Sequence, residues 1–348
     1  MILGCLTRHT RLPLIVVSAR TRILSLAGPL FGVLSIGCSA NLAASSESTD
    51  AEASAVTGIV TVERTASGAE TAPKSDIIAR FVRSRAGVVD DDSLRLVGAA
   101  IDLPAVGACN RLPGASSATK LARSLELLNV GALSFDFPSS AGNGVEAQGK
   151  PEARLVARHL PDVVDLVSGV VYTARGEGEA FPGKGRYVFR AGGSPEQEIA
   201  PFTVEATAKG EPGDIRIADQ ALAHRAEGSP VLIPAVDPTD VTWTPDGTDD
   251  DVIYIDVAAS RAAAGSGGVG ARDTGVRCSF ADTGRATLAA TAFVADEGTI
   301  AIHRVHRESF RAKGIDSGVL RFDFARVASF RRDTGGPGTA PQAGPGRR

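Results

Sequence analysis

The chain has 348 residues, of which 43% are hydrophobic, and this is enough for two ordinary domains with real cores. Its 39 Gly and 19 Pro are typical of many short strands joined by turns rather than of a helical protein. The formal net charge is −3, and a mildly acidic chain repels phosphate backbones, so the composition argues against nucleic acid as a partner.

The first 37 residues have the three parts of a secretory signal. Arg20 and Arg22 supply positive charge, Ile23–Ile36 is a short apolar run, and the small residue Gly37 precedes a cysteine. The apolar run is shorter than the roughly 20 residues that a membrane-spanning helix needs. We therefore expect residues 1–37 to be a signal peptide.

The stretch Leu34-Ser35-Ile36-Gly37-Cys38 resembles the lipobox of bacterial lipoproteins, with Ser35 in place of the family's usual aliphatic residue. The resemblance implies that Cys38 is acylated, becomes the new N-terminus and anchors the protein to a membrane. Ser39 follows where inner-membrane lipoproteins of Gram-negative bacteria have Asp, which implies the outer membrane. A plain secretory signal and a retained anchor are the alternatives.

Two segments of small and polar residues flank the remaining chain. Residues 38–55, with the lipidated cysteine at their start, are expected to form a flexible tether that reaches roughly 20–25 Å as a random coil. Residues 332–348 are rich in Gly and Pro and are expected to be a disordered tail.

Between these ends, short apolar or alternating runs recur with turn residues between them, which predicts antiparallel β-sandwiches. Ser117–Leu128 and Asp162–Ser168 are helix candidates, although the first fits a strand equally well. The predicted strands are Gly58–Arg64, Asp76–Val82, Leu94–Leu103, Ala132–Phe137, Gly169–Ala174, Arg186–Arg190, Pro201–Ala206, Asp214–Ile217, Val241–Thr244, Val252–Val257, Gly275–Phe280, Thr299–Val305 and Val319–Phe324.

A polar stretch at Lys209–Gly213 is the best candidate for a linker. It divides the chain into a β-rich domain at 56–208 and a second sandwich at 214–331. We therefore predict a mostly β protein with two sandwich-type domains behind the signal and the tether.

Two glycine-rich stretches resemble phosphate-binding loops only in part. Gly265–Gly270 fits GxGxxG, but no helix is expected after it to meet a pyrophosphate. Gly178–Gly185 lacks the hydroxyl residue that would bind magnesium, and Pro182 removes a backbone donor. We interpret the first as a loop and the second as a hairpin loop between two strands, so no cofactor is predicted.

Histidines and acidic runs give no metal site. His303 and His306 have HxxH spacing, but an offset of three on a strand puts them on opposite faces. The runs Asp90–Asp92 and Asp246–Asp251 carry oxygen ligands for calcium without EF-hand spacing, so calcium-stabilised adhesion stays an alternative. The sequence has no catalytic motif either, and a pair of carboxylates for hydrolysis is neither supported nor excluded.

Cys109 and Cys278 are the two thiols that remain after export if Cys38 is acylated. Disulfides persist in an oxidising compartment, so the two are a candidate disulfide that closes a loop of about 170 residues. Two buried, unpaired cysteines are the equal alternative.

The segment from Val241-Thr-Trp-Thr to Val252-Ile-Tyr-Ile, followed by Val276-Arg-Cys-Ser-Phe-Ala-Asp-Thr-Gly284, is similar to immunoglobulin-like sandwich repeats of bacterial lipoproteins. No cysteine of this domain precedes Trp243, so the intradomain disulfide of true immunoglobulin domains cannot form. The resemblance implies an immunoglobulin-like fold and brings no activity with it.

These observations together predict a lipid-anchored protein of the cell envelope that binds a protein or glycan through its loops or a sheet face, or acts structurally. The alternatives are an envelope hydrolase that uses paired carboxylates and a calcium-stabilised adhesion module. The hydrolase would hold two facing acids, at least one of them with a raised pKa.

Overall fold

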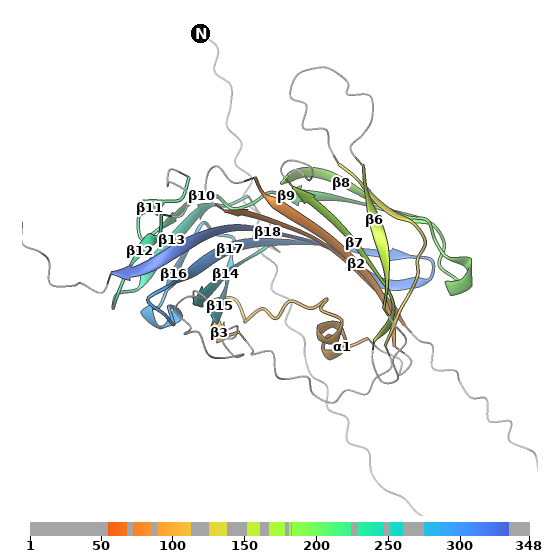
Figure 1. Cartoon of the computed structure of the whole chain (residues 1–348), viewed down its shortest axis with the longest axis horizontal. Coiled ribbons are helices and arrows are strands. Elements are labelled where there is room, and N and C mark those ends of the chain that lie inside the picture. The colour runs from red at the N-terminus through yellow and green to blue at the C-terminus, as the bar shows by residue number, and fades with distance from the viewer. Residues whose placement is uncertain are drawn as a thin grey trace, which may run out of the picture. The chain divides into compact units, whose positions relative to one another are not determined.

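Alternating apolar residues put most of the described chain into strands. The computed structural model describes residues 55–67, 72–84, 89–112, 125–137, 152–160, 167–177, 181, 183–223, 229–246, 251–259 and 275–333. They belong to one unit, Thr49–Arg348. The fold is mostly β, with large sheets of the β-sandwich class, as predicted (Figure 1).

The larger of two sheets has 14 strands and the smaller has four. In sheet order, the larger contains β3 (Cys109–Arg111), β15 (Gly275–Ala281), β14 (Val252–Ala259), β17 (Glu297–Ala312), β18 (Ile315–Asp333), β1 (Val56–Ser67), β2 (Lys74–Ser84), β4 (Leu125–Leu127), β7 (Ser168–Glu177), β6 (Glu152–Leu160), β5 (Leu133–Asp136), β8 (Lys184–Ala191) and β9 (Phe202–Lys209), with β12 (Val231–Pro234) beside β18. The smaller contains β11 (Gln220–Ala221), β10 (Gly213–Ile217), β13 (Thr239–Thr244) and β16 (Arg285–Leu288).

The hairpin of β17 and β18 runs through both hydrophobic cores. Phe322 and Phe324 pack in a first core with residues of β1, β2, β5 and β8. Ile300 and Phe330 pack in a second core with residues of β10, β13, β14 and β15. β1 pairs with β18 in parallel, so the first strand of one predicted domain lies directly beside the last strand of the other. The division at 208 and 214 stays a prediction, and the shared hairpin physically links the two cores.

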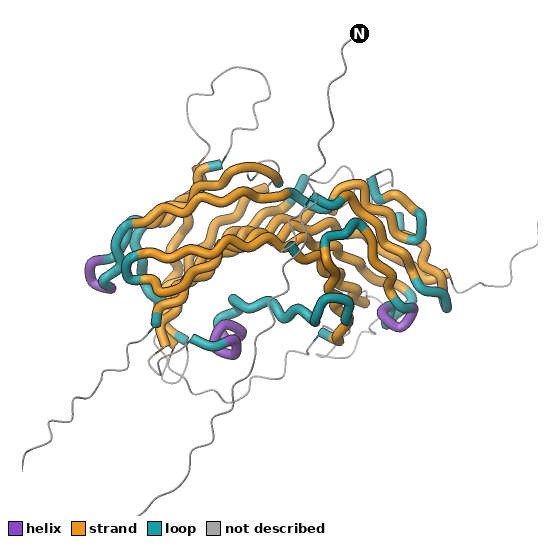
Figure 2. Tube along the Cα trace, turned by 180° about the vertical axis from the view of Figure 1, so that it is seen from behind, coloured by secondary structure: helices purple, strands orange, loops and turns teal. Residues whose placement is uncertain are grey.

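Residues 89–112, which we call the strap, run from α1 (Asp91–Leu96) to β3 (Figures 1 and 2). They cross the face of the large sheet that is turned away from Phe322 and Phe324 of the first core. Asp90 caps α1 by accepting hydrogen bonds from the backbone N–H of Ser93 at 2.9 Å and from its hydroxyl at 2.6 Å. Val97 and Ala99 pack against Ile59 of β1. We call the side of the sheet that faces these residues the strap face.

The structure corrects three local predictions. Leu94–Leu103 is not a strand, because the Asp90 cap starts a helix there and the chain then continues as a loop. Gly178–Gly185 does not close a hairpin, because β7 pairs with β2, β4 and β6 whereas β8 pairs with β5 and β9. The last strand extends to Asp333, two residues into the predicted tail.

Several predicted segments lie outside the described residues. They are the signal, almost all of the tether, residues 334–348, Gly265–Gly270, and most of both helix candidates. Within the described ranges, no helix is both long and apolar enough to cross a membrane.

Candidate functional site

Three carboxylates form a row on the strap face, at in-register positions of three neighbouring strands. Glu63 of β1 pairs with Asp323 of β18 on one side and with Asp76 of β2 on the other. Like charges at directly opposite positions repel one another, so such a row costs stability unless other groups compensate it. We call these three residues the acidic row.

Asp323 is the best-supported member of the acidic row. Its carboxylate, on a side chain that is only 8% exposed, accepts hydrogen bonds from the Tyr254 hydroxyl at 2.7 Å and from His303 Nδ1 at 2.8 Å. The rings of Tyr254 and His303 stack with 4.1 Å between their centroids. Because an ionised carboxylate only accepts, this contact places the His303 proton on Nδ1 and orients the ring, as in a histidine that serves as a general base.

A second ion pair supports the same cluster from β15. Arg277 donates from Nε and Nη2 to the two oxygens of Asp256, each at 2.7 Å, and its Cζ lies 4.6 Å from the centre of the Tyr254 ring. Arg277 Nη1 also donates to the carbonyl of Asp102 in the strap at 3.3 Å. This arginine therefore joins the strap, Asp256 and Tyr254.

The environment shifts the pKa values of Glu63 and Asp323 in opposite directions. Burial acts to raise the pKa of Asp323, but the hydrogen bond and charge of His303, and then the Tyr254 hydroxyl, hold it below its ordinary value. Desolvation, and then the charge of Asp323, raise the pKa of Glu63, although much of the Glu63 side chain remains in contact with solvent. Opposed shifts of this kind are typical of carboxylate pairs with separate acid and base roles.

We predict that Glu63→Gln stabilises the protein at pH 7. A raised folded-state pKa contributes stability that is complete below the unfolded pKa and is lost as pH rises through the folded value. The Gln variant has no charge at this position and therefore avoids that loss of stability. Because solvent screens this exposed group, we expect its free energy of unfolding to rise by only a few tenths of a kcal/mol to about 1 kcal/mol. Urea unfolding of the variant and the parent at several pH values measures the difference.

Glu205→Gln is the matched control, because Glu205 is an exposed glutamate that pairs with Arg186. It should be neutral or slightly destabilising at pH 7. The gain from Glu63→Gln should shrink as pH falls below about 4, where carboxyl groups are protonated in both states. A loss of stability at pH 7 would mean that Glu63 is held by favourable contacts.

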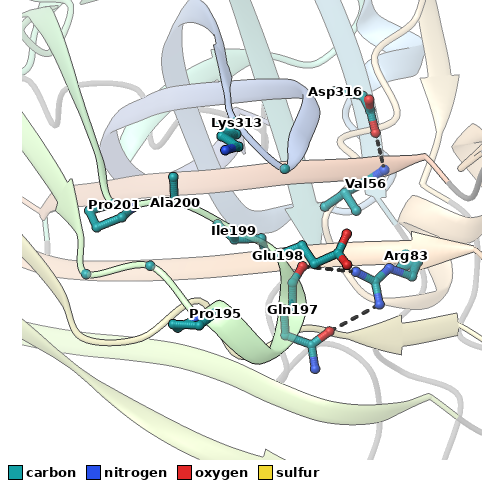
Figure 3. A pocket seen from close by; sticks show the side chains of 13 residues that line it. Val56, Arg83, Pro195, Gln197, Glu198, Ile199, Ala200, Pro201, Lys313 and Asp316 are labelled. Atoms are coloured by element: carbon teal, nitrogen blue, oxygen red, sulfur yellow. Dashed lines mark hydrogen bonds between the residues drawn. The ribbon is translucent and has the colours of Figure 1, made fainter.

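A groove with a volume of about 800 Å³ lies at the end of the first core, next to the turn between β17 and β18 (Figure 3). One wall is the turn η2 (Pro195–Gln197) with Glu198, and the other carries Lys313. Arg83 donates to the Gln197 side chain at 3.1 Å and to its carbonyl at 3.4 Å. The groove is therefore lined by charged side chains of both signs and by glycines.

Backbone contacts fix the walls of this groove. Ser194 and Ile199 exchange hydrogen bonds of 2.8 and 3.0 Å, and the Ala200 N–H donates to the Lys313 carbonyl at 3.1 Å. Gly314 has a φ of +87°, and a Cβ there would lie 2.5 Å from the Glu198 carbonyl oxygen. Only glycine allows the two turns to approach this closely, so the groove is built by packing rather than by a loose loop.

The structure brings together the two cysteines that the sequence singled out as a candidate disulfide. Cys109 and Cys278 form a disulfide that joins β3 to β15, across 169 residues. Cys109 is exposed, whereas Cys278 is fully buried in the second core. Cys38, the expected lipidation site, lies outside the described residues.

Four acids of the two acidic runs make contacts within the protein. Asp90 caps α1, and Asp92 pairs with Arg95 at 2.7 Å. Asp246 pairs with Lys184 at 2.6 Å, and Asp251 contacts His306 at 2.6 Å. In the described ranges, no group of three His, Cys, Asp or Glu side chains is placed to hold a metal ion.

The HxxH histidines lie on opposite faces of β17, as strand spacing predicts. His303 contacts Asp323 on the strap face. His306 contacts Asp251 and stacks on Phe322, whose ring packs in the first core.

No family model and no curated protein matches the sequence. Among solved structures, the chain is similar to the yeast delta-COP-I mu-homology domain, with a TM-score of 0.21 and 8% identity over 80% of this chain and 96% of that one. The same domain complexed with the Dsl1 WxWxV peptide gives a TM-score of 0.19, again with 8% identity and coverage of 80% and 96%. Likenesses this low support no conclusion about fold or function.

Sequence reasoning missed the acidic row. Asp323 and Glu63 are 260 positions apart, and nothing in either strand indicates that the two will pair. The alternation along β14 puts Val252, Tyr254 and Asp256 on one face of the strand, and Tyr254 there contacts Asp323. Polar residues on the buried strands β1 and β18 were a usable signal.

Proposed function

We propose that the protein is a lipid-anchored binding protein of the cell envelope, and that the groove between η2 and the β17–β18 turn holds a segment of a partner protein. The observation that carries this proposal is the groove itself, whose volume of about 800 Å³ falls in the usual range for binding sites. Its walls are fixed by backbone hydrogen bonds, so binding costs little ordering of the site.

The side chains around the groove favour protein over glycan. Glu198, Lys313 and Asp316 are exposed and carry both signs of charge, which is typical of the polar rim of a protein interface. Glycan sites commonly stack sugar rings on exposed aromatic side chains, and no aromatic side chain in the described part of the chain is exposed. A protein segment with charged flanks fits these walls.

The position of the groove also fits a membrane-anchored protein. Val56, the first residue of β1, lines the groove and donates its N–H to the Asp316 carboxylate at 2.8 Å. The proposed tether, residues 38–55, joins the sheet at this residue. In this proposal Cys38 carries the acyl anchor on the outer membrane, and the regions 56–208 and 214–331 are immunoglobulin-like sandwiches whose cores share the β17–β18 hairpin.

The proposal is tested in intact cells with a photo-crosslinking amino acid at position 313. We expect the protein in the membrane fraction and one discrete crosslinked adduct, because a partner in the groove must contact the Lys313 wall. In a Cys38→Ser variant, the protein should move to the soluble fraction, since the acyl anchor has been removed.

The control places the same crosslinker at Val236, which is 82% exposed and does not line the groove. Position 236 should give no matching adduct. Identical adducts at both positions, or none at position 313, would reject the groove, whereas a Cys38→Ser protein that stays in the membrane fraction would reject the anchor.

A hydrolase is the second candidate, favoured by the opposed pKa shifts of Glu63 and Asp323. In this role Glu63 would act as the general acid and Asp323 would remain the ionised partner oriented by His303. A stability gain from Glu63→Gln would support it, because charged groups kept at a cost in stability commonly serve a function.

A further inference from the structure

A second row of side chains lies beside the acidic row on the strap face. Arg307 of β17 is directly opposite Arg321 of β18, and Arg321 is directly opposite Thr61 of β1. Two arginines at opposed positions of antiparallel strands repel each other. This row therefore concentrates positive charge beside the acidic row, and the charges of Asp323 and Glu63 attract Arg321.

Both arginines line a cavity of about 490 Å³ between the strap and the sheet. Leu94, Ala99 and Leu103 of the strap form one side of it, and Ile59 and Val319 of the sheet form the other. Arg321 Nη1 donates to the Ala99 carbonyl at 2.9 Å, so its guanidinium points toward the strap and away from the sheet. The acidic row lies one step further along the same strands.

Two hydrogen-bond donors of this row are buried without partners among the described residues. They are Arg321 Nε and Thr61 Oγ1, on residues that are 8% and 1% exposed. A buried donor without a partner costs roughly 1–3 kcal/mol, and more when it is charged. An oxyanion in the cavity would satisfy the charged donor, Arg321 Nε, because Arg321 lines the cavity.

We propose that this cavity binds a phosphate group, held between Arg307 and Arg321, the two arginines of its lining that are directly opposite each other. Arginine presents parallel N–H donors that match two oxygens of a phosphate, and two arginines balance its double negative charge. The site shares no lining residue with the groove and does not depend on the proposed function.

The other charged residues of the cavity leave this pair available. Arg95 also lines the cavity, but it is held by Asp92 at 2.7 Å and by Asp102 at 2.6 Å. Asp91 and Asp102 are the acids in the lining, so three arginines stand against two aspartates. The volume exceeds that of inorganic phosphate alone, and a phosphate ester with a small organic group fits as well.

The experiment is isothermal titration calorimetry of the full chain with its disulfide intact. Inorganic phosphate and glycerol phosphate are the two probes, and succinate is the carboxylate comparison. We expect saturable binding of at least one phosphate probe. Stronger binding of glycerol phosphate would identify an ester as the natural form, and equal binding would identify free phosphate.

Arg307→Met is the decisive variant, because Arg307 lines the cavity and is exposed, so the change removes a guanidinium without opening a core. Phosphate affinity should fall at least tenfold. The melting temperature without phosphate should stay the same or rise, because the repulsion between Arg307 and Arg321 is relieved.

Arg331→Met is the matched control, since Arg331 is an exposed arginine of β18 that pairs with Glu297 and lies outside the cavity. It should bind phosphate like the parent protein. The proposal is overturned if neither probe binds at about 10 mM (roughly the limit of weak specific sites), if succinate binds more tightly than phosphate, or if Arg307→Met binds phosphate as the parent does.

Discussion

Replacing Arg304 by methionine should destabilise the protein by about 3–5 kcal/mol, as expected when one partner of a buried ion pair is removed. The Arg304 side chain is 2% exposed, and its Nε donates to Asp282, which is 1% exposed, at 2.9 Å. The variant leaves the buried Asp282 carboxylate without this cation. Urea unfolding followed by circular dichroism measures the loss.

The size of this effect also reflects the backbone that Arg304 holds. Its Nη1 donates to the carbonyls of Gly210 and Glu211 at 3.3 and 3.2 Å, and its Nη2 donates to the Thr244 carbonyl at 2.8 Å. Gly210 and Glu211 belong to the predicted linker, so one side chain of the shared hairpin fixes the connection between the two cores.

The matched control is again an arginine-to-methionine change at position 331. The ion pair of Arg331 with Glu297 is 2.9 Å long, but both side chains are more than half exposed, so its loss should cost less than about 1 kcal/mol. Equal losses in the two variants would mean that burial of Arg304 is not what makes it important. A double variant with Asp282→Asn should recover part of the loss, because it removes the buried charge.

Removing the disulfide with Cys109→Ala and Cys278→Ala should cost about 2–5 kcal/mol. A crosslink over 169 residues restricts the unfolded chain strongly, by about 5 kcal/mol in the chain-entropy description and less in most measurements. The loss should also be local, because the disulfide fastens the end of the strap to β15. Hydrogen exchange should therefore speed up in residues 89–112 more than in β17 and β18.

A reducing agent provides the internal control for this prediction. It should lower the melting temperature of the parent protein and leave that of the double variant unchanged. If the strap keeps its protection in the double variant, then the contacts of Arg321 with Ala99 and of Arg277 with Asp102 hold it without the disulfide.

The resemblance to immunoglobulin-like repeats rested on Trp243 and on the stretch that contains Asp282, and the structure joins them. Trp243 Nε1 donates to Asp282 Oδ1 at 2.6 Å, and the Trp243 N–H donates to the Gly284 carbonyl at 3.0 Å. The sequence located both residues but gave no sign of Arg304, which completes the cluster. Its position on a strand of apolar alternation was the available signal, since a charged residue at a core-facing position needs a partner.

The local sequence pattern also failed to predict elements that are short or mostly polar. The strand β6 was not predicted, because its Glu, Arg and His side chains are exposed and leave no apolar alternation. The helix α1 has only six residues, too few to show a helical repeat of apolar residues in the sequence. The Asp90 cap makes this segment helical.

By itself, the sequence determined the β class, the positions of most strands and the outward or inward direction of their side chains. Ile253, Ile255 and Val257 had to face a core because strand residues alternate with a period of two. Only the tertiary structure decided which strands are neighbours. The parallel pairing of β1 with β18 joins segments about 260 residues apart, and no local preference encodes such a register. The acidic row and the groove arise from long-range pairings, because each combines side chains from strands or turns that are distant in the chain. The arginine pair comes from the neighbouring strands of the β17–β18 hairpin.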